Sequence, residues 1–314
     1  MITKLPTYKD FEDVSKQCLT QAVNLLYKVY DEYNEYDDEV IRAEVSLEQI
    51  WKHNSGTIRT SLILLHQGIE TYMKSAICKT TPLLLIEKVR TDWPTLPSRA
   101  DKEFDSLYTI SGEALLTTFC AVSEKKISEE FIEFIETVRQ KRNEAIHGAN
   151  NVSIKAKELL DHILNAYTYC FGKDAWFLET RNFNYENPLF GYFDWDIEYA
   201  VAYKHLDFAL DILGKKKLNK YLSTDILGRA YFCPECKRTI DGDYGYLESR
   251  WAFLKPNKPD STNIHCINCD AEFNVIRKEC KEEECKGNVV HDYGGEETCL
   301  TCFEYQENEL NYIC

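Results

Sequence analysis

The chain has 314 residues, about twice the usual size of one domain, so at least two folded units are expected. It carries 37 Lys and Arg against 52 Asp and Glu, a formal net charge of -15 at pH 7. This balance excludes a protein that coats nucleic acid through bulk positive charge, so any contact with RNA or DNA needs a local site. The apolar share of 44% is ample for a core and argues against a disordered chain.

The first residues and the cysteine content predict a cytoplasmic protein. The N-terminus opens with a lysine, a proline and acidic residues rather than the apolar run of a secretory signal. No window of the sequence approaches the length of a membrane span. Of the 13 cysteines, eight crowd into close pairs within residues 233–302. In an intracellular chain such pairs bind metal more often than they form disulfides.

Residues 1–90 show the spacing of apolar residues that is typical of α-helices. Apolar side chains recur on one helical face over residues 11–29 and again over 58–77. Residues 31–39 contain six acidic residues and no basic one, which predicts a solvated loop or helix face. Prolines and a glycine interrupt residues 91–112, so we expect a connection there with at most short helices.

Two further helices are predicted in the next part of the chain. One has helical spacing from Phe131 to Ile146, with Ser128 as its N-cap and Gly148 as its stop. We expect Ser153 to cap the following helix, which continues to about Cys170.

The composition and the expected secondary structure change between residue 176 and the cysteine-rich region. Residues 176–195 are aromatic-rich and are expected to be irregular, whereas residues 197–212 predict a helix that ends at Gly214. Four lysines in residues 215–220 form a dense basic run, interpreted as a solvated linker or, alternatively, as a guide for nucleic acid. After Asp225, short β-prone segments (229–232, 263–265 and 272–276) alternate with turns.

The predicted fold class is therefore mainly α. Residues 1–220 are expected to form a helical domain with a helical extension and the basic linker. Residues 221–314 are expected to form a small, β-rich domain that metal ions stabilise.

Eight cysteines carry the prediction of metal sites. They form four pairs: Cys233 and Cys236, Cys266 and Cys269, Cys280 and Cys285, Cys299 and Cys302. A short spacer lets both thiolates of a pair reach one tetrahedral ion, and a second pair closes the site. We predict two Zn²⁺ sites that use the pairs sequentially, with an interleaved cross-brace as the alternative. A closed four-thiolate site leaves no position for water, so both sites are expected to be structural.

The segment from Cys285 to Cys302 resembles the zinc ribbons of transcription factors. It departs from their pattern because the preceding pair, Cys280 and Cys285, has four spacer residues rather than two. This second set is acidic, with Glu282, Glu283, Glu284, Asp292, Glu296 and Glu297. Because such charge disfavours phosphate contact, we expect it to bind a protein partner or inhibitor, or to support a dimer.

The sequence Arg142-Asn143-Glu144-Ala145-Ile146-His147 is the one candidate for catalysis. It lies at a predicted helix end, after a strongly apolar helical face. Histidine can act as a general acid or base, and a helix C-terminus favours its charged form. Arginine supplies a planar, always-charged clamp for phosphate oxygens. Asn143 precedes His147 by about one turn and can orient the imidazole or the substrate.

This motif, an Arg, a polar residue, a short spacer and a His, resembles the hallmark of the HEPN superfamily. The helix that contains Glu70-Thr-Tyr-Met-Lys74 is also similar to the second main helix of that family, so the resemblance covers about residues 10–170. It implies an α-helical bundle and, as in many members, a metal-independent endoribonuclease that acts on RNA as a toxin or antiviral defence effector. It also implies a homodimer with a composite active site.

Helix geometry favours the same composite site. Arg142 and His147 are about 140° apart around one helix, too far for a tight pair unless the long arginine side chain curls back. One alternative is that both residues only cap the helix end and bridge to Glu144 or a neighbouring carboxylate. A second is a non-catalytic protein that binds a protein or nucleotide partner.

Three other polar residues are left out of the predicted site. His66 lies beside the apolar face of its helix, which favours a core or interface role. Glu70 and Lys74 form an i, i+4 pair whose ordinary role is helix support.

Overall fold

The computed structural model describes residues 1–35, 43–87, 93–94, 100–124, 126–147, 154–186, 188, 197–243 and 248–306. It divides into two compact units, Met1–Gly172 and Lys173–Cys314. The division lies between Gly172 and Lys173, whereas the expected boundary was at residues 220/221. The helices of residues 175–218 therefore group with the cysteine-rich part of the chain.

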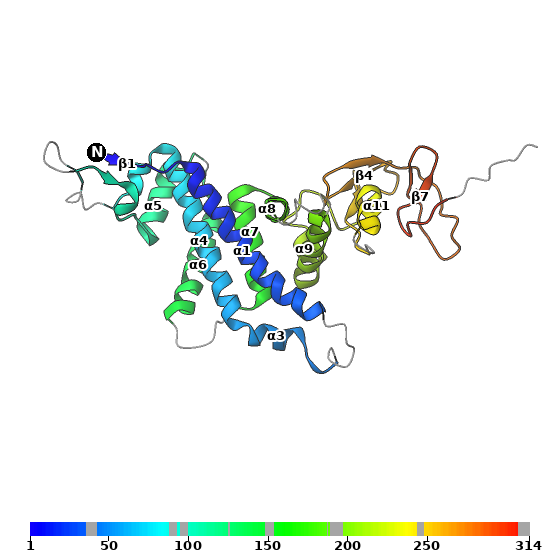
Figure 1. Cartoon of the computed structure of the whole chain (residues 1–314), viewed down its shortest axis with the longest axis horizontal. Coiled ribbons are helices and arrows are strands. Elements are labelled where there is room, and N and C mark those ends of the chain that lie inside the picture. The colour runs from blue at the N-terminus through cyan, green and yellow to red at the C-terminus, as the bar shows by residue number, and fades with distance from the viewer. Residues whose placement is uncertain are drawn as a thin grey trace, which may run out of the picture. The chain divides into compact units, whose positions relative to one another are not determined.

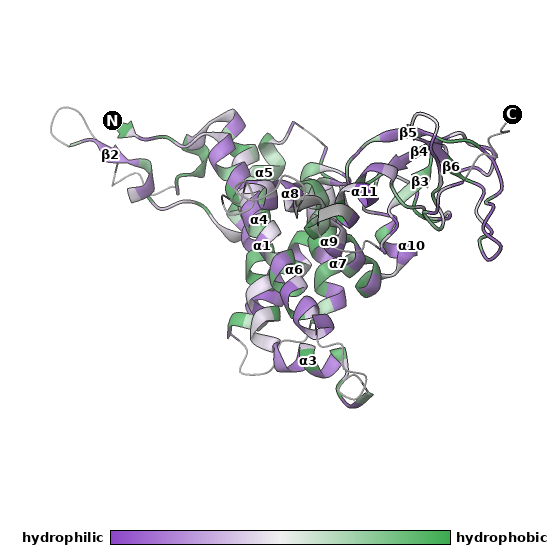
Figure 2. Cartoon of the chain, turned by 45° about the vertical axis from the view of Figure 1, so that its right-hand side comes forward, coloured by the Kyte–Doolittle hydropathy of each residue, from purple (hydrophilic) through white to green (hydrophobic). Residues whose placement is uncertain are grey.

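The first unit is a bundle of helices built on one long pair. Helix α1 (Tyr8–Glu35) packs along α4 (Ser55–Thr80) (Figure 1), and these two carry the apolar faces predicted at 11–29 and 58–77. Hydrophobic and hydrophilic residues alternate along these helices (Figure 2), as amphipathic helices require. The remaining elements are α3 (Leu47–His53), η1 (Pro82–Leu85), β1 (Ile2–Thr3), β2 (Lys102–Glu103), η3 (Phe104–Ser106), α5 (Gly112–Val122), α6 (Glu129–His147) and α7 (Ala156–Phe171).

Small and polar residues at the contact between α1 and α4 explain how closely the two helices approach. The Ser15 hydroxyl donates a hydrogen bond to the Gly68 carbonyl at 2.7 Å, and the Ser61 hydroxyl donates to the Ala22 carbonyl at 2.8 Å. A Cβ at Gly68 would lie 2.8 Å from the side chain of Leu19, so glycine lets the two backbones meet here.

Helix α6 carries the candidate motif, and its start was predicted correctly. The backbone N–H of Phe131 donates to the Ser128 hydroxyl at 3.2 Å, which confirms Ser128 as the cap. A buried stripe recurs along α6 at Phe131, Ile135, Val138 and Ala145. The predicted stop at Gly148 lies outside the described residues.

The start of α7 differs from the prediction. The helix begins at Ala156 with Lys155 at the N-cap position and no side-chain cap bond, so Ser153 is not its N-cap. Ser153 itself lies outside the described residues. The helix ends at Phe171, close to the expected Cys170, and Gly172 follows with a positive φ of 98°.

The second unit begins with two helices that support the cysteine-rich part. Helix α8 (Ala175–Tyr185) corrects the prediction that the segment from 176 onwards is irregular. Its aromatic side chains Trp176 and Phe177 are fully buried, so tertiary packing compensates for their modest helix propensity. Helix α9 (Ile197–Leu213) ends at Gly214, which has φ 82°, as predicted.

The basic run after Gly214 is part of the folded unit. It contains the short helix α10 (Lys215–Leu218), which packs against α9, and its Leu218 side chain is fully buried. The Lys215 ammonium donates to the Gly228 carbonyl at 2.6 Å. The run is therefore not the free linker that its charge suggested.

The rest of the unit is small and strand-rich. Helix α11 (Pro234–Asp243) precedes an antiparallel sheet of β3 (Ala252–Leu254), β4 (Asn263–Cys266) and β5 (Glu272–Asn274). A hairpin of β6 (Val290–Asp292) and β7 (Glu297–Cys299) follows, and Ile276 bridges to Val290. The predicted β-prone segments 263–265 and 272–276 supply β4 and β5. The fold class, mainly helical with a small strand-rich C-terminal region, is confirmed at this level.

Candidate functional site

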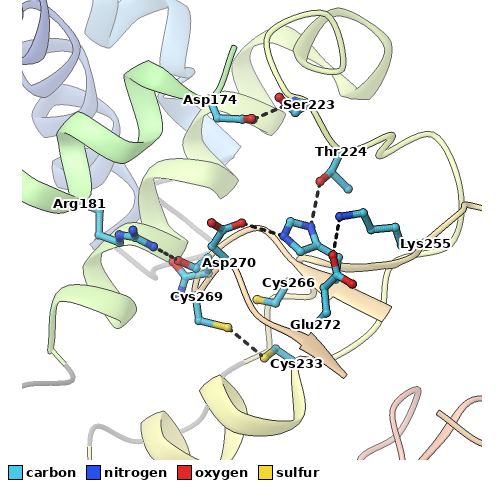
Figure 3. Close-up of polar contacts among 12 residues, drawn as sticks. Asp174, Arg181, Ser223, Thr224, Cys233, Lys255, Cys266, Cys269, Asp270 and Glu272 are labelled. Carbon is cyan, nitrogen blue, oxygen red and sulfur yellow. Dashed lines mark hydrogen bonds and ion pairs between the residues drawn. The ribbon is translucent and has the colours of Figure 1, made fainter. Parts of the chain in front are cut away.

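The first cysteine cluster joins two knuckles that lie far apart in sequence. Cys233 and Cys236 stand at the start of α11, whereas Cys266 ends β4 and Cys269 lies in the following turn. Their four sulfur atoms lie within 4.8 Å of one another. The Cys233–Cys269 sulfurs are 3.7 Å apart (Figure 3), and the Cys236–Cys266 sulfurs are 3.9 Å apart. Ligands at about 2.3 Å from a tetrahedral ion are about 3.8 Å from each other, so the spacing fits one ion.

The second cluster has the same geometry on the β6–β7 hairpin. The sulfurs of Cys280, Cys285, Cys299 and Cys302 also lie within 4.8 Å of one another. The Cys280–Cys302 distance is 3.7 Å and the Cys285–Cys299 distance 3.9 Å. Each cluster uses neighbouring pairs in the chain, so the predicted sequential grouping is the one present and the cross-brace is wrong.

The long spacer of the second cluster is accommodated by local turns. The backbone N–H of Cys285 donates to the Glu282 carbonyl at 3.0 Å, which folds the four intervening residues back. The N–H of Cys280 donates to the Gly287 carbonyl at 2.8 Å. Both turns bring the two thiols to one side, so a longer spacer still closes a four-sulfur site.

Polar residues around the first cluster were not predicted from the sequence. The Tyr203 hydroxyl lies 3.8 Å from the Cys266 sulfur, and the Asn268 side-chain amide donates to the Cys236 sulfur at 3.8 Å. Burial, and then the nearby cysteine sulfurs, raise the pKa of Tyr203 well above its ordinary value. The phenol therefore keeps its proton and can donate to a thiolate. The guanidinium of Arg181 donates to the Asn268 carbonyl at 2.7 Å and ties this knuckle to α8 (Figure 3).

His265 is placed beside the first cluster without being one of its ligands. Its Nε2 is 2.9 Å from Asp270 Oδ1 and its Nδ1 is 3.0 Å from the Thr224 hydroxyl (Figure 3). The ring lines a cavity of about 370 Å³ in the second unit. With both nitrogens engaged, His265 braces the turn between Cys266 and Cys269, as residues behind metal ligands commonly do.

Gly287 is the residue at which we expect a small substitution to disturb the second cluster. An added Cβ would lie 2.8 Å from the Cys299 sulfur and 2.7 Å from Thr301. The Gly287→Ala variant should therefore bind about one metal ion per chain instead of two, as measured by elemental analysis. Gly56→Ala is the matched control, because nothing lies within 4 Å of that added methyl group. Two ions per chain in both variants would contradict the expectation.

The Arg142–Asn143–His147 motif occupies the last turns of α6, as predicted. Arg142 Nη1 donates to Asn143 Oδ1 at 3.0 Å. Arg142 is half-buried, and its Nε is enclosed with no hydrogen-bond partner among the described residues. His147 is exposed and, within the described ranges, has no hydrogen bond or ion pair. Glu144 accepts a hydrogen bond from Gln140 at 3.0 Å.

These positions bear on the alternative in which both residues only bridge carboxylates at the helix end. In the described part of the chain, neither Arg142 nor His147 forms an ion pair with Glu144. The two residues differ in exposure within one chain, because Arg142 is half-buried and His147 is exposed. This difference is what the 140° interval between them leads one to expect.

A buried pair on α4 was missed by sequence reasoning. His66 Nδ1 lies 3.6 Å from Glu70 Oε2, with side-chain exposures of 10% and 19%. Glu70 therefore pairs with His66, whereas the Lys74 ammonium donates to the Thr109 hydroxyl at 3.4 Å. Burial lowers the pKa of His66, the Glu70 carboxylate opposes this, and the charges of Arg142 and Arg139 lower it further. The i, i+4 spacing of His66 and Glu70 was the available signal.

The lowered pKa of His66 has a consequence for stability. A histidine whose folded-state pKa is depressed stabilises the fold fully only above its unfolded value of about 6.5. The free energy of unfolding should fall as pH drops below that value towards the folded-state pKa. We expect this loss to be smaller in His66→Gln, measured by urea unfolding with far-UV circular dichroism across this range. Identical pH dependence of the two proteins would contradict it.

Comparison with protein-family models, curated proteins and solved structures found no match. Among the described helices, none is both long and apolar enough to cross a membrane. The functional evidence is therefore carried by two features of the chain itself, the paired four-cysteine clusters and the Arg142–His147 end of α6.

Proposed function

We propose that this protein is a metal-independent endoribonuclease of the HEPN type. The observation that carries the proposal is the end of α6, where Arg142 donates a hydrogen bond to Asn143 and an exposed His147 follows one turn later. Among the described residues, His147 has no hydrogen bond or ion pair. An acid–base group and a fixed cation at one helix end are the groups that RNA cleavage requires. The resemblance to HEPN proteins further suggests a cytoplasmic toxin or antiviral defence effector.

The proposed reaction uses only groups of the chain. His147 removes the proton of a ribose 2′-OH, whose oxygen attacks the adjacent phosphorus. The bond from phosphorus to the 5′-oxygen breaks, and a protonated imidazole donates a proton to that leaving oxygen. Arg142 holds the phosphate oxygens while negative charge builds on them. The products are a 2′,3′-cyclic phosphate and a 5′-hydroxyl.

The geometry of α6 supports a site shared by two protomers. One histidine cannot act as base and acid in the same step, so a second imidazole is needed, and a two-fold axis supplies it from an identical chain. Two copies of Arg142 would also concentrate positive charge on an acidic protein, whose net charge is -15. In this proposal the homodimer is the active form.

We also propose that each cysteine cluster holds a structural Zn²⁺ ion. Four thiolates at tetrahedral spacing suit zinc, and a closed site has no open position for a reacting water. The ions stabilise a region of short strands and turns. They take no part in the cleavage step.

The test is cleavage of single-stranded RNA by the purified protein in EDTA. We expect cleavage that leaves cyclic phosphate ends and is lost in Arg142→Ala and His147→Ala. Because EDTA can also withdraw cluster metal, the metal content of each protein is measured after the reaction. Unchanged cleavage by both variants would overturn the assignment of the site.

A second candidate is a non-catalytic protein that binds a macromolecular partner. Glu282, Glu283 and Glu284 are exposed beside the second cluster and favour a basic protein surface over phosphate. If wild-type protein leaves RNA intact in the same assay, this candidate replaces the nuclease.

A further inference from the structure

The two cysteine clusters differ in how well their cysteines are shielded from solvent. In the first cluster, Cys233, Cys236 and Cys266 are buried, and the fourth member is partly exposed. In the second cluster, Cys299 is buried and the other three cysteines are partly exposed. An oxidant reaches a cysteine sulfur only where the side chain is accessible, so the second cluster is the more open to oxidation.

A surface cavity borders the second cluster. Cys285 and Cys302 both line this cavity, whose volume is about 890 Å³. Three basic and four acidic side chains share its wall, so their charges nearly cancel and do not select a charged reagent. The cavity of about 370 Å³ beside the first cluster has, within the described part of the chain, none of that cluster's cysteines in its wall. A small neutral molecule can therefore reach the second cluster more readily than the first.

Buried polar side chains add to the shielding of the first cluster. The Tyr203 hydroxyl lies 3.8 Å from the Cys266 sulfur, and the Asn268 amide donates to the Cys236 sulfur at 3.8 Å. Tyr203 and Asn268 are themselves almost fully buried. Backbone N–H groups donate to sulfur in both clusters, so those bonds do not distinguish them. The difference between the clusters is the cover over their sulfurs.

We infer that the second cluster is a site of oxidative modification by hydroperoxides, from which the first cluster is protected. The inference rests on the proposed metal sites, because a metal ion holds its cysteines as thiolates, the form that reacts. It does not depend on the proposed cleavage of RNA.

Hydrogen peroxide is the simplest such reagent. A thiolate of the second cluster attacks one peroxide oxygen, the O–O bond breaks, and a sulfenic acid and a hydroxide form. A second thiolate attacks the sulfenic sulfur and expels another hydroxide, which leaves a disulfide. Two thiolates thereby give two electrons to one peroxide, and two protons from solvent convert both hydroxides into water.

The sulfur distances indicate which disulfides form. The sulfurs of Cys280 and Cys302 are 3.7 Å apart, and those of Cys285 and Cys299 are 3.9 Å apart. Small side-chain rotations can therefore bring the members of each pair into bonding contact. Each disulfide removes two of four ligands, so the cluster can no longer hold its ion.

The experiment treats the full, zinc-loaded chain with hydrogen peroxide and follows metal release with a colorimetric zinc indicator. We expect about one of the two ions per chain to leave well before the other. Mass spectrometry should then find disulfides among the second cluster's cysteines, while those of the first cluster can still be alkylated after unfolding. A thiol reductant with added Zn²⁺ should restore the lost ion. Release of both ions together, earlier oxidation of the first cluster, or no release would overturn the inference.

Cys120→Ser is the matched control. Cys120 is an exposed cysteine of the first unit that belongs to neither cluster, so its loss should leave the release unchanged. Release that disappears in this variant would place the reactive thiol outside the second cluster and overturn the inference. If the purified chain holds no zinc, the metal proposal fails, and the order in which the two sets of cysteines oxidise still decides the present one.

Discussion

Loss of metal from the first cysteine cluster should unfold the strand-rich region of the second unit while α1, α4 and α6 stay folded. The cluster holds the start of α11 and the end of β4 together, and the three-stranded sheet around it has only short strands. Structural zinc sites contribute apparent free energies of roughly 10–16 kcal/mol, which exceeds the total stability of a small domain. The helices of the first unit have their own apolar core.

The experiment compares Cys266→Ser with Cys120→Ser. Cys266 is a buried member of the cluster, whereas Cys120 is an exposed cysteine of the first unit that belongs to neither cluster. Hydrogen exchange followed by mass spectrometry should show loss of protection in β3, β4 and β5 of Cys266→Ser alone. A zinc chelator added to wild-type protein should reproduce that pattern. Full protection of the sheet after the metal has left would contradict a structural role.

Substitution of His147 by alanine should lower RNA cleavage by roughly 10²- to 10⁴-fold, the range that a general acid or base contributes. Substitution of Arg142 by alanine should lower it by roughly 10²- to 10³-fold, the range for one group that stabilises charge in the transition state. Folding should be unaffected by the change at His147, which is exposed and forms no hydrogen bond or ion pair with any described residue. His53→Ala is the matched control because His53 is also an exposed histidine at the end of a helix, α3. It should cleave at the wild-type rate.

Mixing wild-type protein with His147→Ala tests the shared site. If the base and the acid come from the two protomers, a dimer with one altered chain lacks one of the two imidazoles and is inactive. After subunit exchange of equal amounts, about a quarter of the dimers are wild type, so about a quarter of the activity of the same total amount of wild-type protein should remain. About half of that activity, although mass measurements show mixed dimers, would contradict the composite site.

Several parts of the fold could be predicted because their signals are local. Apolar periodicity identified α1, α4, α6 and α9, and the hydroxyl of Ser128 marked the start of α6. Helix α8 was missed, because the aromatic residues Trp176 and Phe177 are poor helix formers whose burial outweighs their propensity. The basic run after Gly214 was interpreted from its charge as a solvated linker. The buried side chain of Leu218 instead makes it part of the second unit.

By itself, the sequence determined which eight cysteines form the clusters, because thiol pairs at short spacing can serve few other purposes in such a chain. It also identified Arg142 and His147 as the candidate catalytic pair. Only the tertiary structure decided how the cysteine pairs combine, because their spacing along the chain permits both the sequential and the interleaved grouping. It also brought Tyr203 to the first cluster and His66 with Glu70 to the side of α6. Such contacts join residues from different elements, and packing rather than local pattern creates them.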